Sequence, residues 1–293
     1  MPSINLNGEL FHYGSVGEGL PFVFQHGMGA DVTQPLSSGG KLAGWRMIAM
    51  DCRGHGQTEA NLDPARISFV QFAEDLALLL DSLKIERAVV GGISMGAGVA
   101  LAFALAHPER VNGLILVRPA WLDRPFPTNL RWFPLAASLL QDYPVDEAAR
   151  RFEQLPEFSE LAAGSRPAAD SLLGQFRRPH ARERASILVG MPASVPVTSL
   201  TQCRQLQVPT LVVVNAQDPV HPDVLGEQLA AAIPGAALSR ITSKAESETL
   251  HQADLARTLQ DFLEPIRRQF SSRTLDSSAR SSIHTQRGES SRC

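Results

Sequence analysis

The sequence has few of the residues that mark specialised classes of protein. Its three cysteines, Cys52, Cys203 and Cys293, lie far apart and match no metal-binding spacing, so we expect neither a disulfide framework nor a cysteine metal site. No stretch approaches the roughly 20 uncharged apolar residues of a membrane span. The first residues also lack the basic and apolar regions of a signal peptide. We therefore expect no membrane partner and a cytoplasmic location.

Charge and composition narrow the class further. The formal net charge is only −3, which gives no electrostatic reason to expect nucleic acid as a partner. Aromatic residues make up 6% of the chain and hydrophobic residues 44%, which is typical of a globular protein with an aliphatic core. The 293 residues suffice for one large domain with an insertion, or for two small domains. The sequence does not indicate an oligomeric state.

Short apolar runs alternate with helical patterns along much of the chain. Residues 67–84 have apolar positions at helical spacing, with Ser68 as a candidate N-cap, and a final helix is expected over 253–262. Brief runs that end at glycine or polar residues are typical of buried parallel strands. Strands are expected at residues 8–13, 21–25, 45–50, 88–90, 114–117, 210–214 and 238–242. This alternation predicts an α/β fold with a mostly parallel sheet and helices on both faces.

Two segments interrupt the pattern. Residues 121–205 contain many prolines and short helical stretches without a buried-strand run, so we interpret them as an inserted helical cap. Residues 269–293 are rich in serine and arginine and nearly devoid of apolar side chains, which predicts a disordered tail. Residues 1–120 and 206–268 then form the α/β core.

The most informative motif is a G-x-S-x-G sequence from Gly92 to Gly96. A β-branched strand precedes it and an alanine-rich helix follows it. A sharp strand-to-helix turn of this kind exposes the serine hydroxyl at the top of the sheet, and side chains at the two glycines would crowd it. The pattern therefore predicts Ser94 as a nucleophile.

With two further motifs, the chain resembles the α/β-hydrolase family over roughly residues 8–265. These motifs are His26 to Gly29 after an early strand, and Asp51 to Gly56 after the next strand. The resemblance implies an eight-stranded, mostly parallel sheet with a cap inserted after the sixth strand. It also implies an oxyanion hole made of the backbone N–H groups of Met28 and Met95.

The resemblance assigns the other motif residues mainly to structure. His26 is expected to brace the oxyanion loop. Asp51, Arg53 and His55 are expected to hold the loop after their strand through charge-assisted hydrogen bonds.

The resemblance also points to the acid of a catalytic triad. Asp218 follows the strand at 210–214, where the family usually carries the carboxylate that orients the histidine. Asp123, after the sixth strand, is an alternative.

The base departs from the family's commonest pattern. Most relatives have a Gly-His pair shortly after the last strand, but here residues 242–250 contain no histidine. His251 comes several residues later and follows Ser94 and Asp218 in the right order, so it is the expected base. His221 is the rival, although we expect three residues from Asp218 to be too few for the usual geometry. If His251 only caps a surface helix, the triad is broken.

These residues predict a serine hydrolase of the carboxylesterase or lactonase kind that acts on a small acyl substrate, without a metal or organic cofactor. The alternatives are a lyase or acyltransferase on the same fold, and a catalytically silent binding protein. Arg118, Arg124 and Arg131 could hold a substrate carboxylate or be solvated surface residues. Cap aromatics could line an apolar pocket or simply pack the cap on the core, and the candidates for substrate binding are Trp121, Phe126 and Trp132.

Overall fold

The computed structural model describes residues 1–38 and 42–287, with side chains up to residue 270. Its eight strands form one sheet in the order β1-β2-β4-β3-β5-β6-β7-β8. The first two strands run antiparallel to their neighbours, and all pairs from β4 to β8 are parallel. The strands are β1 (Ser3–Leu6), β2 (Glu9–Val16), β3 (Leu20–Gln25), β4 (Trp45–Met50), β5 (Ala88–Ile93), β6 (Val111–Val117), β7 (Thr210–Val214) and β8 (Ala237–Arg240). The eight-stranded, mostly parallel sheet is confirmed; β1 had no counterpart among the strands predicted by position.

Helices cover both faces of this sheet, and others form an insertion at one end of it. They are α1 (Thr33–Ser38), α2 (Phe69–Ser82), α3 (Met95–Ala106), α4 (Trp132–Asp142), α5 (Val145–Glu153), α6 (Pro156–Gly164), α7 (Arg166–Arg177), α8 (Ile187–Ala193), α9 (Asp223–Ala232) and α10 (Glu248–Arg287). Short 3₁₀ helices are η1 (Pro64–Arg66), η2 (Pro108–Arg110), η3 (Thr128–Leu130) and η4 (Leu200–Gln205). The expected N-cap of α2 is present, because Ser68 Oγ accepts a hydrogen bond from Gln71 N–H.

The alternation of side chains along each buried strand divides the core into two layers. Val90 of β5 belongs to the layer beneath α2 and α3, whereas its neighbour Val89 belongs to the opposite layer. On that second face, α10 buries Leu255, Leu259 and Leu263 against the sheet. Both faces of β5 are therefore dry, which explains why its sequence is continuously apolar.

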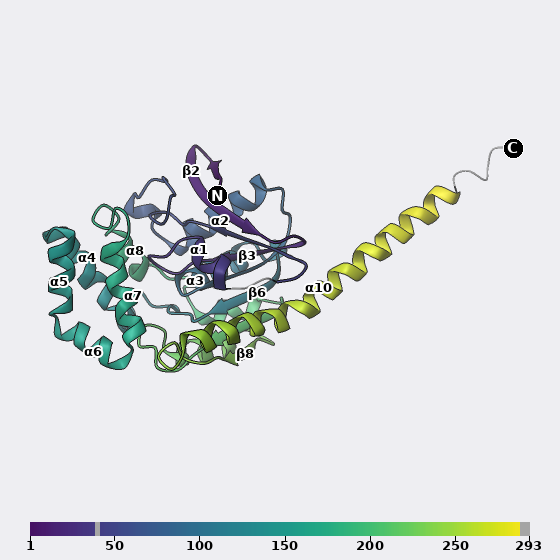
Figure 1. The fold of residues 1–293 in the computed structure, drawn as a ribbon. Helices are drawn as coiled ribbons and strands as arrows, with labels where there is room; N and C mark the ends of the chain where they lie inside the picture. Colours follow the sequence, from purple (N-terminus) through teal and green to yellow (C-terminus); the bar gives the residue numbers. More distant parts are fainter. Residues whose placement is uncertain (39–41, 288–293) are drawn as a thin grey trace.

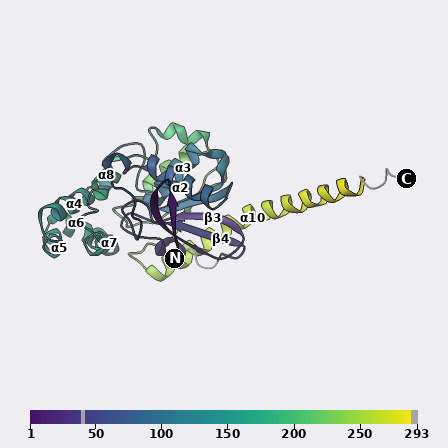
Figure 2. The same ribbon diagram turned by 90° about the horizontal axis from the view of Figure 1, so that it is seen from above.

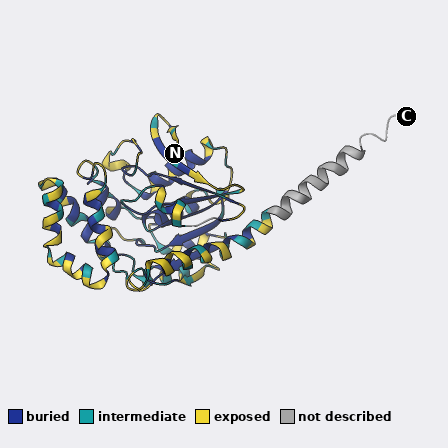
Figure 3. Ribbon diagram, in the orientation of Figure 1, coloured by how far each residue is buried: buried dark blue, intermediate teal, exposed yellow. Residues whose placement is uncertain are grey.

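The helical insertion lies between β6 and β7 and comprises α4 to α8 (Figure 1). Seen from above, these helices gather at one end of the sheet, and α10 extends from the other side of the molecule (Figure 2). Their buried residues are shown dark in Figure 3 and merge with those of the core into one apolar cluster. The predicted cap is thus confirmed as a helical insertion.

The last helix, α10, extends to Arg287, into the segment predicted to be disordered, and residues 288–293 lie outside the described residues. The disordered tail stays a prediction.

A buried ionic network holds the loop after β4, as the motif there indicates. Arg53 donates two hydrogen bonds to Asp75 of α2, at 2.7 and 2.8 Å, and a third to Glu9 of β2. The hydrogen bond from Arg53 is the main cause that lowers the pKa of Glu9 to about 2, although partial burial opposes the shift. The Asp51 carboxylate accepts from His12 Nδ1 and from backbone N–H groups of neighbouring loops. The loop is therefore tied to the first strands and to α2.

Removing the cation of this network should be costly. The Arg53→Leu variant leaves the buried Asp75 carboxylate without its partner, so we expect the free energy of unfolding to fall by about 3 kcal/mol, measured by urea denaturation. Arg166→Leu is the matched control, because it breaks an ion pair with Asp170 in which both side chains are more than half exposed. Equal effects of the two variants would contradict the buried network's role.

Candidate active site

Ser94 lies in a strained turn between β5 and α3. Its backbone has φ 56° and ψ −112°, a conformation that is costly for any residue other than glycine. A Cβ added at Gly92 would collide with the backbone of Gly96, and one added at Gly96 would collide with the Gln25 carbonyl. Ser94 N–H donates to the Val117 carbonyl of β6 at 2.9 Å. Close packing thus fixes the turn and presents the hydroxyl at the carboxyl edge of the sheet.

His221 connects this hydroxyl to a carboxylate. Its Nε2 lies 2.8 Å from Ser94 Oγ, and its Nδ1 lies 2.9 Å from Asp218 Oδ2. An ionised carboxylate only accepts hydrogen bonds, so Nδ1 carries the proton and Nε2 is free to accept from the serine hydroxyl. Ser94, His221 and Asp218 therefore form one continuous hydrogen-bonded chain.

A turn brings the side chains of Asp218 and His221 together although only two residues lie between them. His221 N–H donates to the Asp218 carbonyl at 3.1 Å, with Pro219 at the second position. Asp at the first and Pro at the second position are typical of such turns, which bring the first and fourth residues close together. The expectation that three residues are too few for this geometry does not hold, because the turn sets both side chains on the same side. The Asp-Pro pair was the sequence signal for it.

Asp218 is held ionised by its surroundings. Burial alone would raise its pKa, but the neighbouring His221 and the Arg118 guanidinium more than offset this effect and hold the pKa below its ordinary value. Arg118 Nη1 lies 3.3 Å from the carboxylate oxygen that also contacts His221. The other oxygen accepts from the backbone N–H groups of Val220 and His221.

His221 is held in its neutral form. Burial lowers its pKa, the Asp218 carboxylate counteracts part of that shift, and the positive charges of Arg118 and Lys244 lower it further. A neutral imidazole beside a serine hydroxyl is the form required of a general base.

His251, the histidine expected to be the base, has a different hydrogen-bond partner. It lies in the first turns of α10, and its Nδ1–H donates to the Thr242 carbonyl at 2.8 Å. Its side chain is buried, and burial, followed by the charge of Arg118, lowers its pKa to about 4. The structure thus brings His221, and not His251, to Ser94. The cause is local: His251 lies in the first turn of α10, and its ring is held by the Thr242 carbonyl of the loop after β8.

The loop after β3 has the features expected of an oxyanion loop. His26 Nδ1–H donates to the Gly27 carbonyl, and its Nε2 accepts from Cys52 N–H, which ties this loop to the one after β4. Gln175 of the cap donates to the Met28 carbonyl at 3.2 Å. Met95 begins α3, so its N–H has no carbonyl partner within the helix. The N–H groups of Met28 and Met95 as oxyanion donors stay a prediction.

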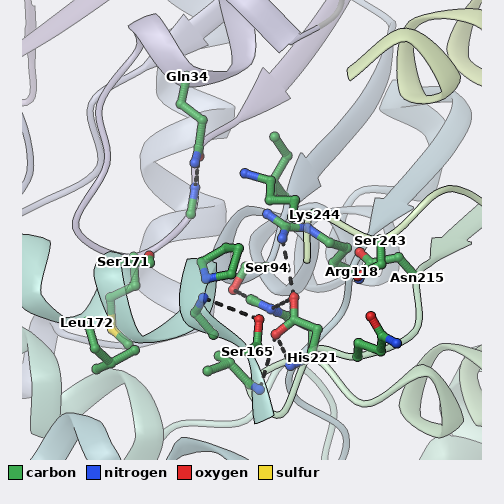
Figure 4. Close-up of a pocket in the computed structure, with 18 of the residues that line it drawn as sticks. Gln34, Ser94, Arg118, Ser165, Ser171, Leu172, Asn215, His221, Ser243 and Lys244 are labelled. Carbon is green, nitrogen blue, oxygen red and sulfur yellow. Dashed lines mark hydrogen bonds and ion pairs between the residues drawn. The ribbon is translucent and has the colours of Figure 1, made fainter. Parts of the chain in front are cut away.

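A pocket opens over Ser94, beneath the cap (Figure 4). The pocket has a volume of about 680 Å³ that no protein atom occupies, and part of this volume is open to solvent. The carboxyl ends of the strands contribute Ser94, Arg118, His221 and Lys244, and the cap contributes Phe133, Ser165 and Leu172. Sequence reasoning did not anticipate the polar residues among them, which include Gln34, Asn215, Ser243 and Lys244.

The aromatic residues expected to bind substrate lie elsewhere. Trp121 is buried against Phe69 and donates its indole N–H to the Met191 carbonyl, and Trp132 donates to the Glu157 carbonyl inside the cap. Phe126 is 56% exposed. None of the three lines the pocket over Ser94. Trp121 and Trp132 pack the cap, because their large rings are buried there and each indole N–H finds a carbonyl acceptor.

The three candidate arginines and Asp123, the alternative acid, lie in different parts of the structure. Only Arg118 lines the pocket; Arg124 is exposed, and Arg131 pairs with Glu160 and stacks on Trp132. Asp123 accepts from Leu200 N–H in the insertion.

Within the described part of the chain, no group of three or more His, Cys, Asp or Glu side chains is placed to hold a metal ion. Nor does any helix of that part have the length and apolar character to cross a membrane.

Comparison with known proteins agrees with this geometry. The alpha/beta hydrolase fold family matches the chain over residues 21–251. The chain belongs to this family. One similar protein is 2-hydroxymuconate semialdehyde hydrolase of Pseudomonas putida, 28% identical over 84% of this chain and 88% of the relative. Another is a 2-hydroxy-6-oxononadienedioate/2-hydroxy-6-oxononatrienedioate hydrolase of the same species, 29% identical over 88% and 93%.

Among solved structures, the fold is similar to an enol-lactonase from Burkholderia xenovorans, with a TM-score of 0.71 and 24% identity over 90% of this chain and all of the other. A thermophilic esterase from Thermogutta terrifontis has the same TM-score and identity, over 90% of this chain and 97% of its own. At this identity the likeness shows the fold alone.

The state of His251 can be tested directly. Its imidazole should stay neutral, with the proton on Nδ1, until the pH falls to about 4, because burial disfavours the cation. The measurement is a pH titration followed by ¹⁵N–¹H NMR of the histidine rings, with His251→Asn to assign the signals. Protonation near pH 6.5 would show that the ring is not buried as described.

Proposed function

We propose that this α/β hydrolase cleaves a small ester, lactone or related acyl substrate through an acyl-enzyme on Ser94. The observation that carries the proposal is the hydrogen-bonded chain from Ser94 Oγ through the His221 ring to Asp218. The base is therefore His221, and Asp218 orients it and stabilises its charged form.

The proposed reaction has two halves. His221 Nε2 takes the hydroxyl proton as Ser94 Oγ attacks the substrate carbonyl, while the N–H groups of Met28 and Met95 stabilise the oxyanion. The protonated imidazole then gives its proton to the departing oxygen as the carbonyl–oxygen bond breaks. A water molecule, deprotonated by His221, attacks the acyl-enzyme and releases the acid, and Ser94 recovers its proton.

The relatives support this class of reaction. Both relatives described above are hydrolases by name, and the structural neighbours include an enol-lactonase and an esterase. The names of these four proteins agree on hydrolysis but differ in substrate.

Labelling and two histidine variants test the assignment. A fluorophosphonate should modify Ser94 in the folded protein, with Ser94→Ala as the control for site. His221→Ala should lower kcat/KM for short-chain p-nitrophenyl esters by roughly 1,000-fold or more, because the base is lost. His251→Asn keeps a donor for the Thr242 carbonyl and should lose far less.

Other outcomes select the alternatives. An unmodified Ser94 would favour a silent binding protein, and an ester product formed only with an added alcohol would favour an acyltransferase. A large loss in His251→Asn with little loss in His221→Ala would return the base to His251.

The pH profile tests the charges around the base. Since burial and the nearby cations lower the pKa of His221, kcat/KM should stay high below pH 6.5 and fall only when the ring is protonated. Arg118→Gln removes one of those cations, so protonation becomes easier and the acidic limb should move to higher pH. The profile is measured from pH 4 to 8 with a neutral ester, and a shift to lower pH would contradict the electrostatic account.

A further inference from the structure

Two cationic side chains line the pocket beside Ser94. Arg118 directly follows β6, and Lys244 lies on the loop after β8. The Arg118 side chain is only 10% exposed, whereas that of Lys244 is 31% exposed. Figure 4 draws both on the same side of the pocket, together with His221.

The one described carboxylate that lines the pocket near these two cations already accepts hydrogen bonds from other residues. Among the described residues that line the pocket, Asp218 is the single carboxylate, and its oxygens accept from His221 and Arg118. The nearest carboxylate to Lys244 is Glu248, whose Oε1 is 4.0 Å from Nζ and whose side chain is 68% exposed. The pocket therefore holds two cations against one occupied anion.

This arrangement leaves donors unused and charge uncompensated. Arg118 Nε is buried and has no hydrogen-bond partner among the described residues, although Nη1 contacts Asp218. Burial and the charge of Arg118 lower the pKa of Lys244, which reflects the cost of keeping two cations together away from water. A bound anion would offset that cost.

We propose that Arg118 and Lys244 form a carboxylate-binding subsite, so that the substrate is an acyl compound that also carries a carboxylate. Lys244 supplies a mobile ammonium at the mouth, and Arg118 supplies a fixed guanidinium deeper in the pocket. The loop after β8 serves here to bind the substrate, because His221 acts on Ser94 from another loop. The subsite rests on the proposed function for its place in the reaction, but its binding of a carboxylate can be measured separately.

Matched ester pairs measure the preference. Mono-4-nitrophenyl succinate and 4-nitrophenyl pentanoate differ by a carboxylate on the acyl side. On the leaving-group side, 4-acetoxybenzoate and its methyl ester differ in the same way. We expect kcat/KM to favour the charged member of at least one pair, with the difference mainly in KM, because the subsite acts on binding.

Lys244→Met removes the charge while it keeps a side chain of similar length. The preference for the charged ester should then fall by about tenfold, and Lys244→Arg should restore part of it. Lys84→Met is the matched control, because Lys84 is exposed and does not line this pocket. Its ratio should equal that of the unmodified protein. Equal rates for charged and neutral esters, or an unchanged ratio in Lys244→Met, would overturn the subsite.

A binding measurement separates this outcome from failure of the proposed function. Glutarate should bind Ser94→Ala in isothermal titration calorimetry, and Lys244→Met in that background should weaken the Kd by about tenfold. If Ser94 is not labelled by a fluorophosphonate but glutarate binds in this way, the hydrolase proposal fails and the subsite stands. If Ser94 is labelled but glutarate does not bind, the subsite fails and the hydrolase stands.

Discussion

The turn between β5 and α3 constrains everything else at the carboxyl edge of the sheet. Ser94 takes a left-handed backbone conformation there because the Gly92 and Gly96 backbones approach too closely for side chains. That strain is sustained by the surrounding packing: β5 is buried on both faces, and α3 is buried along nearly its whole length. The hydroxyl therefore has a fixed position, and the side chains of the other loops at this edge are placed relative to it.

Two loops at this edge differ from the pattern expected from the family: the proposed base lies on the loop after β7, and the loop after β8 contributes a lysine to the pocket. The turn from Asp218 to His221 carries both the proposed acid and the proposed base, and backbone hydrogen bonds within the turn position the two side chains together. The loop after β8 brings no histidine to Ser94 and contributes Lys244 to the pocket. His251 remains nearby but braces the start of α10 through the Thr242 carbonyl. Charge at the site is thus shared among strand ends that are distant in sequence.

The cap contributes to the site in an unexpected manner. Its largest aromatics, Trp121 and Trp132, are used for packing and satisfy their indole donors on backbone carbonyls. The residues that reach the pocket are smaller or polar, such as Ser165 and Leu172, and Gln175 steadies the Met28 carbonyl. An insertion built in this way shapes the pocket through its helices and leaves the strand ends to supply the charge.

The sequence by itself determined the mostly parallel sheet, the helical insertion and the turn at Ser94, because each depends on local patterns of apolar residues, glycine and proline. The position of Asp218 as the acid came from the resemblance to the family. The sequence did not determine which histidine meets Ser94. Order along the chain favoured His251, whereas the Asp-Pro turn folds His221 back onto both partners at 2.8 and 2.9 Å. Nor could it show that Arg118 and Lys244 share one pocket, since they are 126 positions apart in the chain and meet only because parallel strands end at the same edge. Such meetings are decided by tertiary structure alone.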